Sequence, residues 1–363
     1  MAESAARTKY RQTKLAVIRW IEEQGLQPGD RLPPVRKLMT IHGVSYATIT
    51  RALSELREAG IIDQQWGKGI FVRQRGTSLR NLAVTLNDIN TPQHPQIERI
   101  IRGIGSELAA TDWRLQTFML PGGAIFGQAD EPLLAALLRE RRIDAVLALS
   151  PHPPQDMDQL HALSIPVVAV ENEFPQTGTA SVTPSILQSA ALLAEHLCDR
   201  LGHRRINLVL GPKHPYSARL QRFSAAFGQA MLSELRGRRL RRPESALLYC
   251  NYRWDDAKET IGRWLTGSER PTAIVLSDDE MAMQTVVLAR SLGLSVPKDL
   301  SVVTSALVRS DSGSITGLLV PWEELGKRAV QLLRRIAAGE SPTVERVSVE
   351  LKVGESSSSA PRQ

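Results

Sequence analysis

The stretch GVSYATITRALSELREAGIIDQQWGKGIFV, residues 43–72, decides the fold of the first part of the chain. Apolar residues recur at intervals of three and four after Ser45, which predicts a helix with one buried face and Ser45 as its N-cap. The apolar face consists of Ile49, Ala52, Leu53 and Leu56. Two apolar runs, 61–62 and 70–72, flank Trp66-Gly67-Lys68-Gly69, which predicts a β-hairpin with a lysine between two glycines at its tip.

Two amphipathic helices are expected before this unit. Apolar residues three apart predict a first helix that ends at Gly25, and an i, i+3, i+4 pattern predicts a shorter second helix that ends at Gly43. Turn residues 28–30 separate the two helices. Three helices followed by a hairpin make a winged helix-turn-helix, an α+β fold.

The positive charge of the chain is concentrated in this N-terminal part. The formal net charge is +7, and residues 1–75 hold 13 lysines and arginines against 7 acidic residues. Residues 76–363 are almost balanced, with 32 basic and 31 acidic residues. This distribution is typical of a small nucleic-acid reader joined to a neutral partner domain.

The third helix and the hairpin tip supply the candidate contacts with a duplex. A reading helix places the side chains of its first turns in the major groove, and a glycine-flanked lysine can approach the minor groove or a phosphate. These residue types give as candidate DNA contacts Ser45, Tyr46, Thr48, Thr50, Arg51 and Lys68. A helix-turn-helix that serves protein contacts stays an alternative at this point.

Residues 10–73 closely resemble the GntR family of winged-helix regulators. The resemblance rests on Pro28-Gly29-Asp30-Arg31-Leu32-Pro33, Arg36-Lys37-Leu38, Gly43-Val44-Ser45, Ala52-Leu53 with Leu56, Gly60-Ile61 and Gly67-Lys68-Gly69-Ile70-Phe71-Val72. It implies DNA contacts from Arg36, Ser45, Thr48 and Gly67. Family members often carry arginine where Tyr46 and Thr50 stand, so the resemblance implies a different operator.

Residues 79 onward alternate between short β-branched runs and amphipathic helices, after a polar linker at 74–78. This alternation predicts an α/β domain with mostly parallel sheets and helices on both faces. Strands are expected at 82–84, 115–118, 145–149, 167–170, 206–210, 273–276 and 300–303. Ligands of such sheets bind outside the carboxyl ends of the strands.

This second part resembles the effector domain of LacI/GalR regulators, which is similar to a two-lobed periplasmic sugar-binding protein. The resemblance rests on residues 143–146, 165–168, 201–206, 271–274, 279–282, 296–302 and 324–326. It implies effector contacts from Glu171, from Arg219 or Arg222, and from Asp279. Aspartates usual in the family are missing at 304–307 and 182–185, so the effector is an unusual sugar or another polar molecule.

These observations predict a DNA-binding transcription regulator, a repressor, whose operator affinity is controlled by a small polar effector bound between two lobes. We expect a winged helix at 1–73, a linker at 74–78, a sensing domain at 79–355 and a disordered serine-rich tail at 356–363. We also expect a homodimer on double-stranded operator DNA, because one winged helix contacts few phosphates.

Other function classes find less support in the sequence. A GntR-type reader fused to an aminotransferase needs a longer second domain and a Schiff-base lysine in a cofactor-binding context, so we expect no enzyme and no cofactor. A sugar-binding module without regulation does not explain the basic winged helix. Cys198 and Cys250 stand alone, which predicts neither a disulfide framework nor a zinc site. No signal peptide and no run of 18 apolar residues occurs, so we expect a cytoplasmic protein without a membrane span.

Overall fold

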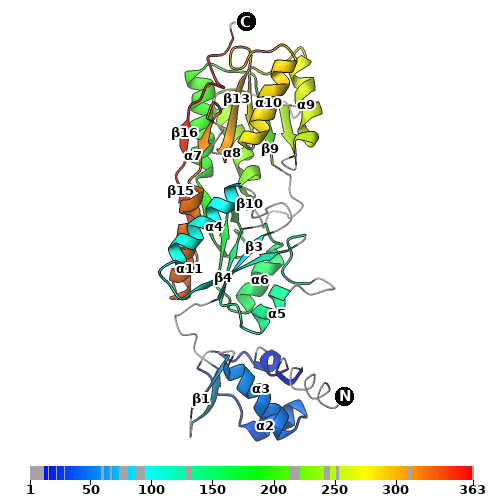
Figure 1. The fold of residues 1–363 in the computed structure, drawn as a ribbon, viewed down its shortest axis with the longest axis vertical. Coiled ribbons are helices and arrows are strands. Elements are labelled where there is room, and N and C mark those ends of the chain that lie inside the picture. The colour runs from blue at the N-terminus through cyan, green and yellow to red at the C-terminus, as the bar shows by residue number, and fades with distance from the viewer. Residues whose placement is uncertain are drawn as a thin grey trace.

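The computed structural model places a winged-helix region at one end of the molecule and two α/β lobes beyond it (Figure 1). It describes residues 12–14, 16–21, 23–27, 29–58, 61–65, 68–72, 81–86, 95–120, 122–127, 133–149, 151–211, 221–240, 246–250, 253–308 and 313–361. No helix within these ranges is long and apolar enough to cross a membrane.

The winged-helix region has the predicted elements. Helical residues between 12 and 23 are followed by α2 (Val35–His42), α3 (Tyr46–Glu58), β1 (Ile62–Gln65) and β2 (Gly69–Val72). The four apolar residues that predicted the third helix are all buried, and Ile49 and Leu56 pack with Leu38 in one core. Strands β1 and β2 pair antiparallel from Ile62 opposite Val72 to Gln65 opposite Gly69. The spacing argument is therefore confirmed for this region.

The N-terminal lobe is built on a parallel sheet of six strands in the order β15-β8-β6-β5-β3-β4. Its strands are β3 (Asn81–Leu86), β4 (Arg114–Met119), β5 (Ala145–Ala148), β6 (Val167–Val170), β8 (Ala180–Pro184) and β15 (Val344–Val347). Its helices are α4 (Pro95–Leu108), α5 (Leu133–Arg139), α6 (Pro154–Ala162) and α11 (Trp322–Ala337). Strands β5 and β6 are buried along their whole length, as expected for parallel strands covered by helices on both faces.

The C-terminal lobe contains a second six-stranded sheet, in the order β11-β9-β12-β13-β14-β16. Its strands are β9 (Ile206–Leu210), β11 (Leu247–Tyr249), β12 (Ala273–Leu276), β13 (Ser301–Leu307), β14 (Thr316–Leu319) and β16 (Glu350–Lys352), and only β16 runs antiparallel to its neighbour. The helices are α7 (Ile186–Ala194), continued by the π-helical turn η1 (Glu195–Arg200), α8 (Phe223–Gly237), α9 (Trp254–Thr266) and α10 (Asp279–Ser291). The predicted α/β fold with parallel sheets is confirmed.

In the described residues the chain crosses between the lobes three times, after β8, after β14 and after β15. The second crossing leads into α11, which lies beside α4 (Figure 1). Glycines permit this close packing: a Cβ at Gly103 would lie 2.0 Å from the Glu323 carbonyl oxygen, and one at Gly326 would lie 2.2 Å from that of Ile100. Two lobes joined by several crossing segments can close on a ligand as a hinge.

The serine-rich C-terminal segment is ordered as far as the structure describes it, so the prediction of a disordered tail is wrong for residues 356–361. The Ser356 backbone N–H donates to the Ser314 carbonyl (3.0 Å), and its hydroxyl donates to the Val302 carbonyl (2.5 Å). The buried His203 ring contacts the Ser358 carbonyl through Nε2 (2.9 Å). Serine hydroxyls that suggested disorder therefore satisfy backbone groups of the C-terminal lobe.

Candidate nucleic-acid interface and effector site

Helix α3 begins at a cap that its sequence predicted. The Thr48 backbone N–H donates to Ser45 Oγ (3.3 Å), and the Ser45 and Thr48 hydroxyls lie 2.8 Å apart. The helix buries one face in the core, and the opposite face exposes Tyr46, Thr50 and Arg51 to solvent. Tyr46 is 62% exposed, so its aromatic ring and hydroxyl are available for contact with a partner.

The remaining predicted DNA contacts lie on two other elements. Arg36 is exposed in the first turn of α2, and Lys68 is exposed at the turn between β1 and β2. Gly67 lies outside the described residues. At least one exposed polar or basic side chain therefore lies on each of three elements: α2, the first turn of α3, and the wing. A winged helix needs this arrangement to contact both grooves and the phosphates.

A third backbone segment supports the wing. The Leu32 N–H donates to the Ile70 carbonyl (2.8 Å), and the Gly29 N–H donates to the Val72 carbonyl (2.9 Å). Arg31 forms an isolated antiparallel bridge with Phe71. The turn before α2 is thereby tied to the hairpin, so the wing holds a defined position relative to the reading helix.

Glu171 marks the carboxyl end of β6, at the edge where effectors of parallel sheets bind. Its φ of 64° is uncommon for a residue other than glycine. Gln96 Nε2 lies 2.5 Å from both carboxylate oxygens, which fixes the orientation of the Glu171 side chain.

Of the two arginines named as effector contacts, Arg219 lies outside the described residues. The backbone of Arg222 belongs to a short strand, β10 (Gln221–Arg222), which pairs antiparallel with β7 (Asn172–Glu173). Arg222 stands opposite Asn172 in this pairing, so its backbone lies next to Glu171 in the fold.

The carboxyl end of β12 carries two adjacent aspartates with different environments. Asp279 is 1% exposed and accepts a hydrogen bond from the Val308 backbone N–H (3.1 Å). Asp278 is half-buried, caps α10 by accepting from the Met281 N–H (2.8 Å), and accepts from the Ser277 hydroxyl (2.8 Å). Burial raises the pKa of the Asp278 carboxyl, opposed by the Met281 N–H. Asp278 is therefore the more accessible carboxylate, and sequence reasoning singled out only its neighbour.

Trp322 is a further site candidate that the sequence analysis missed. It follows the second crossing between the lobes and is the first residue of α11. Its side chain is 3% exposed, and within the part of the chain that the structure describes its indole Nε1 has no hydrogen-bond partner. A buried indole N–H usually has a partner. A lone tryptophan at a strand-to-helix junction was the only signal for it in the sequence.

A buried polar network lies at the carboxyl edge of the N-terminal lobe. His152 Nδ1 donates to the Gly123 carbonyl (2.5 Å), and its Nε2 then accepts from the Thr85 hydroxyl (2.7 Å). Asp156 accepts from the Ile125 N–H (2.6 Å) and the Phe126 N–H (3.2 Å). The network holds the loop at 122–127 against the end of β3, and no local sequence pattern indicated it.

Burial shifts the two ionisable groups of this network in opposite senses. It lowers the pKa of His152 to about 4 and raises the pKa of Asp156 to about 6. The backbone groups that they contact reduce each shift without cancelling it. His152 Nδ1 and Asp156 Oδ2 are 3.9 Å apart, and at neutral pH the imidazole is neutral.

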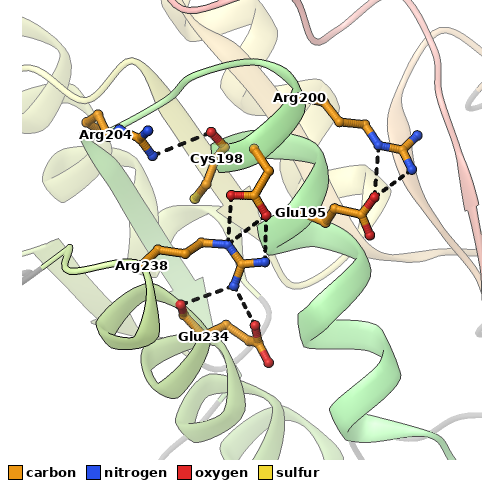
Figure 2. Close-up of polar contacts among 7 residues, drawn as sticks. Glu195, Cys198, Arg200, Arg204, Glu234 and Arg238 are labelled. Atoms are coloured by element: carbon orange, nitrogen blue, oxygen red, sulfur yellow. Dashed lines mark hydrogen bonds and ion pairs between the residues drawn. The ribbon is translucent and has the colours of Figure 1, made fainter.

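The charged residues around η1 form ion pairs and hydrogen bonds within the C-terminal lobe, so we assign them a structural role (Figure 2). Arg238 lies between Asp199 (2.7 Å) and Glu234 (2.5 Å), and both carboxylates raise its pKa. Cys198 is buried beside them, and burial raises the pKa of its thiol to about 11, so it is a poor nucleophile. The described residues contain no group of histidine, cysteine and acidic side chains that could hold a metal ion.

Comparison with known proteins supports both halves of this architecture. Residues 9–72 match the family described as bacterial regulatory proteins, gntR family, and residues 194–357 match the periplasmic binding protein-like domain. The chain joins a GntR-type DNA-binding region to a periplasmic-binding-protein-like domain. This composite protein is a DNA-binding transcription regulator, as the sequence predicted.

The similarity to known relatives and solved structures extends over most of the chain. The arabinose metabolism transcriptional repressor of Geobacillus stearothermophilus is 25% identical, covering 90% of this chain and 90% of the relative. A complex of the transcriptional regulator CelR with cellobiose matches with a TM-score of 0.66 at 20% identity, over 86% of this chain and 91% of that one. The lac repressor dimer bound to operator and an anti-inducer matches with a TM-score of 0.65 at 18% identity, over 78% and 96%. These structural likenesses establish the fold of the regulator.

Proposed function

We propose that this regulator is a cytoplasmic repressor, not an enzyme, that acts as a homodimer and changes its operator affinity when a small polar effector binds between its lobes. The observation that carries the proposal is the exposed face of α3, with Tyr46, Thr50 and Arg51, held beside a wing that presents Lys68. An exposed aromatic residue among hydroxyl and basic groups suits a groove of DNA better than it suits water.

The proposed DNA contacts have different roles. Tyr46, at the start of α3, contacts base edges or sugars, while Ser45, Thr48, Thr50 and Arg51 lie near the phosphates. Arg36, Gly67 and Lys68 contact the backbone from α2 and the wing. Phosphate contacts fix the position of the protein, and base contacts determine the sequence that it prefers.

Binding to a duplex from the protein's own upstream region tests this assignment. Replacing Lys68 by alanine should weaken operator and unrelated DNA alike and lower the salt slope by about one unit, because one phosphate contact is lost. Replacing Tyr46 by alanine should change the preference at one base position. Arg57→Ala, an exposed arginine in the last turn of α3, is the matched control. Absence of salt-dependent binding by the wild-type protein would overturn the proposed function.

The effector site lies where the carboxyl ends of both sheets face each other across the hinge. Glu171, Arg219 or Arg222, Asp278 and Trp322 are the proposed contacts, with Asp279 positioning the loop at Val308. Paired polar groups with an aromatic side chain suit a polyol. One relative is named for arabinose metabolism, and one matching structure contains cellobiose. A thermal-shift screen of sugars and related metabolites tests the class of effector.

The homodimer is supported by apolar side chains exposed on both lobes. Val287 is 63% exposed and Met283 40% exposed on one face of α10. On the N-terminal lobe, Leu133 at the start of α5 is 68% exposed, and Met119 ends the edge strand β4. A second copy that covers both patches would place two winged helices on a two-fold symmetric operator.

A fusion to an aminotransferase is the competing proposal, and purified protein distinguishes the two. A pyridoxal absorbance band that sodium borohydride shifts would favour the enzyme. The comparisons favour the regulator, since a relative named as a transcriptional repressor matches along 90% of the chain.

A further inference from the structure

Arg31 lies at the wing although it precedes the hairpin by two helices. Its backbone bridges to Phe71 of β2, so the main chain fixes the point from which its side chain extends. Arg31 is exposed to solvent. In the sequence, Arg31 stood out only as part of the stretch Pro28–Pro33 that resembles the GntR family.

The guanidinium of Arg31 rests on Gly69, directly after Lys68. A Cβ at Gly69 would lie 2.7 Å from Arg31 Nε, closer than real Cβ atoms approach, and 3.1 Å from Nη2, which is a tight contact. The φ of Gly69 is also +120°, which residues other than glycine rarely adopt. Gly69 therefore shapes the turn and leaves room for the arginine plane above it.

The charge of Arg31 is not used within the described part of the protein. No ion pair or side-chain hydrogen bond of Arg31 occurs there, and the same holds for Lys68. Arg238 offers a contrast, because two carboxylates surround its guanidinium and fix it for a structural role. A positioned guanidinium without a carboxylate is prepared for an external anion.

We infer that Arg31 is a second cation of the wing, which contacts a backbone phosphate next to the one that Lys68 contacts. The inference rests on the proposed DNA-binding function and adds a residue to it. A guanidinium presents several N–H donors in one plane, which matches the oxygens of a phosphate. Because the guanidinium of Arg31 already packs against Gly69, the side chain loses less conformational entropy when it binds a phosphate.

Fluorescence anisotropy with the full-length protein tests the inference. Arg31→Ala, Arg31→Lys, Lys68→Ala, the double variant and the control Arg57→Ala are titrated with operator and with unrelated duplex between 50 and 200 mM salt. One lost phosphate contact lowers the salt slope by about 0.9, so the affinity ratio of wild type to Arg31→Ala should shrink about 3.5-fold across this range. The double variant should lose about twice that slope. Arg31→Lys should keep the slope and bind more weakly than wild type.

The binding measurements can overturn the inference in two ways. A salt slope and affinity of Arg31→Ala equal to those of Arg57→Ala would overturn the inference, even where Lys68→Ala behaves as proposed. A loss confined to the operator would also overturn it, because a phosphate contact carries no sequence information. Circular dichroism and thermal unfolding of both Arg31→Ala and Arg31→Lys check that each variant folds, since the bridge to Phe71 uses only the backbone of residue 31. Wild-type protein without salt-dependent binding would refute the proposed function itself.

Discussion

Substitutions in the His152–Asp156 network should change the pH dependence of stability in opposite directions. In the folded protein the pKa of Asp156 is about 6 and that of His152 is about 4, whereas the ordinary pKa values of these groups in water are 3.8 and 6.5. Between pH 4 and 6 the pair therefore binds one proton in either state. That proton lies on Asp156 in the folded protein and on His152 in the unfolded chain.

Folding moves this proton without exchanging one with solution, so the intact pair adds no pH dependence to stability over that window. In Asp156→Asn, His152 titrates alone, and its pKa is lower in the folded protein than in the unfolded chain. The contribution of His152 to the free energy of unfolding is therefore present above pH 6.5 and lost as the pH falls toward 4. In His152→Gln, Asp156 titrates alone with a raised folded pKa. The contribution of Asp156 to the free energy of unfolding is therefore present below pH 3.8 and lost as the pH rises through 6.

One proton over two pH units corresponds to about 3 kcal/mol. Relative to wild type, Asp156→Asn should therefore lose about 3 kcal/mol more unfolding free energy at pH 4 than at pH 6. His152→Gln should lose a similar extra amount at pH 6 relative to pH 4. Urea unfolding at pH 4, 5, 6 and 7, followed by circular dichroism, measures both differences. Asp158→Asn, an exposed carboxylate on the same helix, is the control. Parallel pH profiles for the two variants would refute the reasoning.

Two further predictions concern the effector site and the dimer. Asp278→Asn should weaken effector binding about 10- to 150-fold in calorimetry and leave DNA binding unchanged, since charge-assisted hydrogen bonds contribute about 1.5–3 kcal/mol. Asp279→Ala should instead lower unfolding free energy by about 1–3 kcal/mol in urea titrations, because the Val308 N–H loses its acceptor; equal effects of both variants on the effector would contradict this division. Val287→Glu should convert the dimer to monomer in sedimentation velocity and weaken operator binding, and an unchanged dimer would move the interface away from α10.

The helices and strands could be predicted from the sequence wherever the spacing of apolar residues fitted only one kind of secondary structure. Helix α3 and the wing were predicted because a 3.6-residue period, a serine cap and a glycine-bracketed turn agree with one another. The buried strands were found from short β-branched runs, since parallel strands covered on both faces have few polar residues. The position of Arg31 at the wing could not be predicted, because it depends on a bridge to Phe71 that sequence separation conceals.

The features that the sequence did not reveal share a physical cause, which is that polar side chains acquire their roles from partners distant in sequence. Four consecutive serines indicate disorder by composition, yet the hydroxyl of Ser356 contacts the carbonyl of Val302, which no local pattern encodes. Likewise, nothing in the letters at 278–279 separates a half-buried cap from a buried acceptor. Asp278 has the extended backbone of an N-cap and Asp279 is the first helical residue, so a one-residue shift changes which carboxylate meets the solvent. Predicting a site of this kind therefore requires the packing around each strand end, where the nearest backbone N–H decides which carboxylate remains available to a ligand.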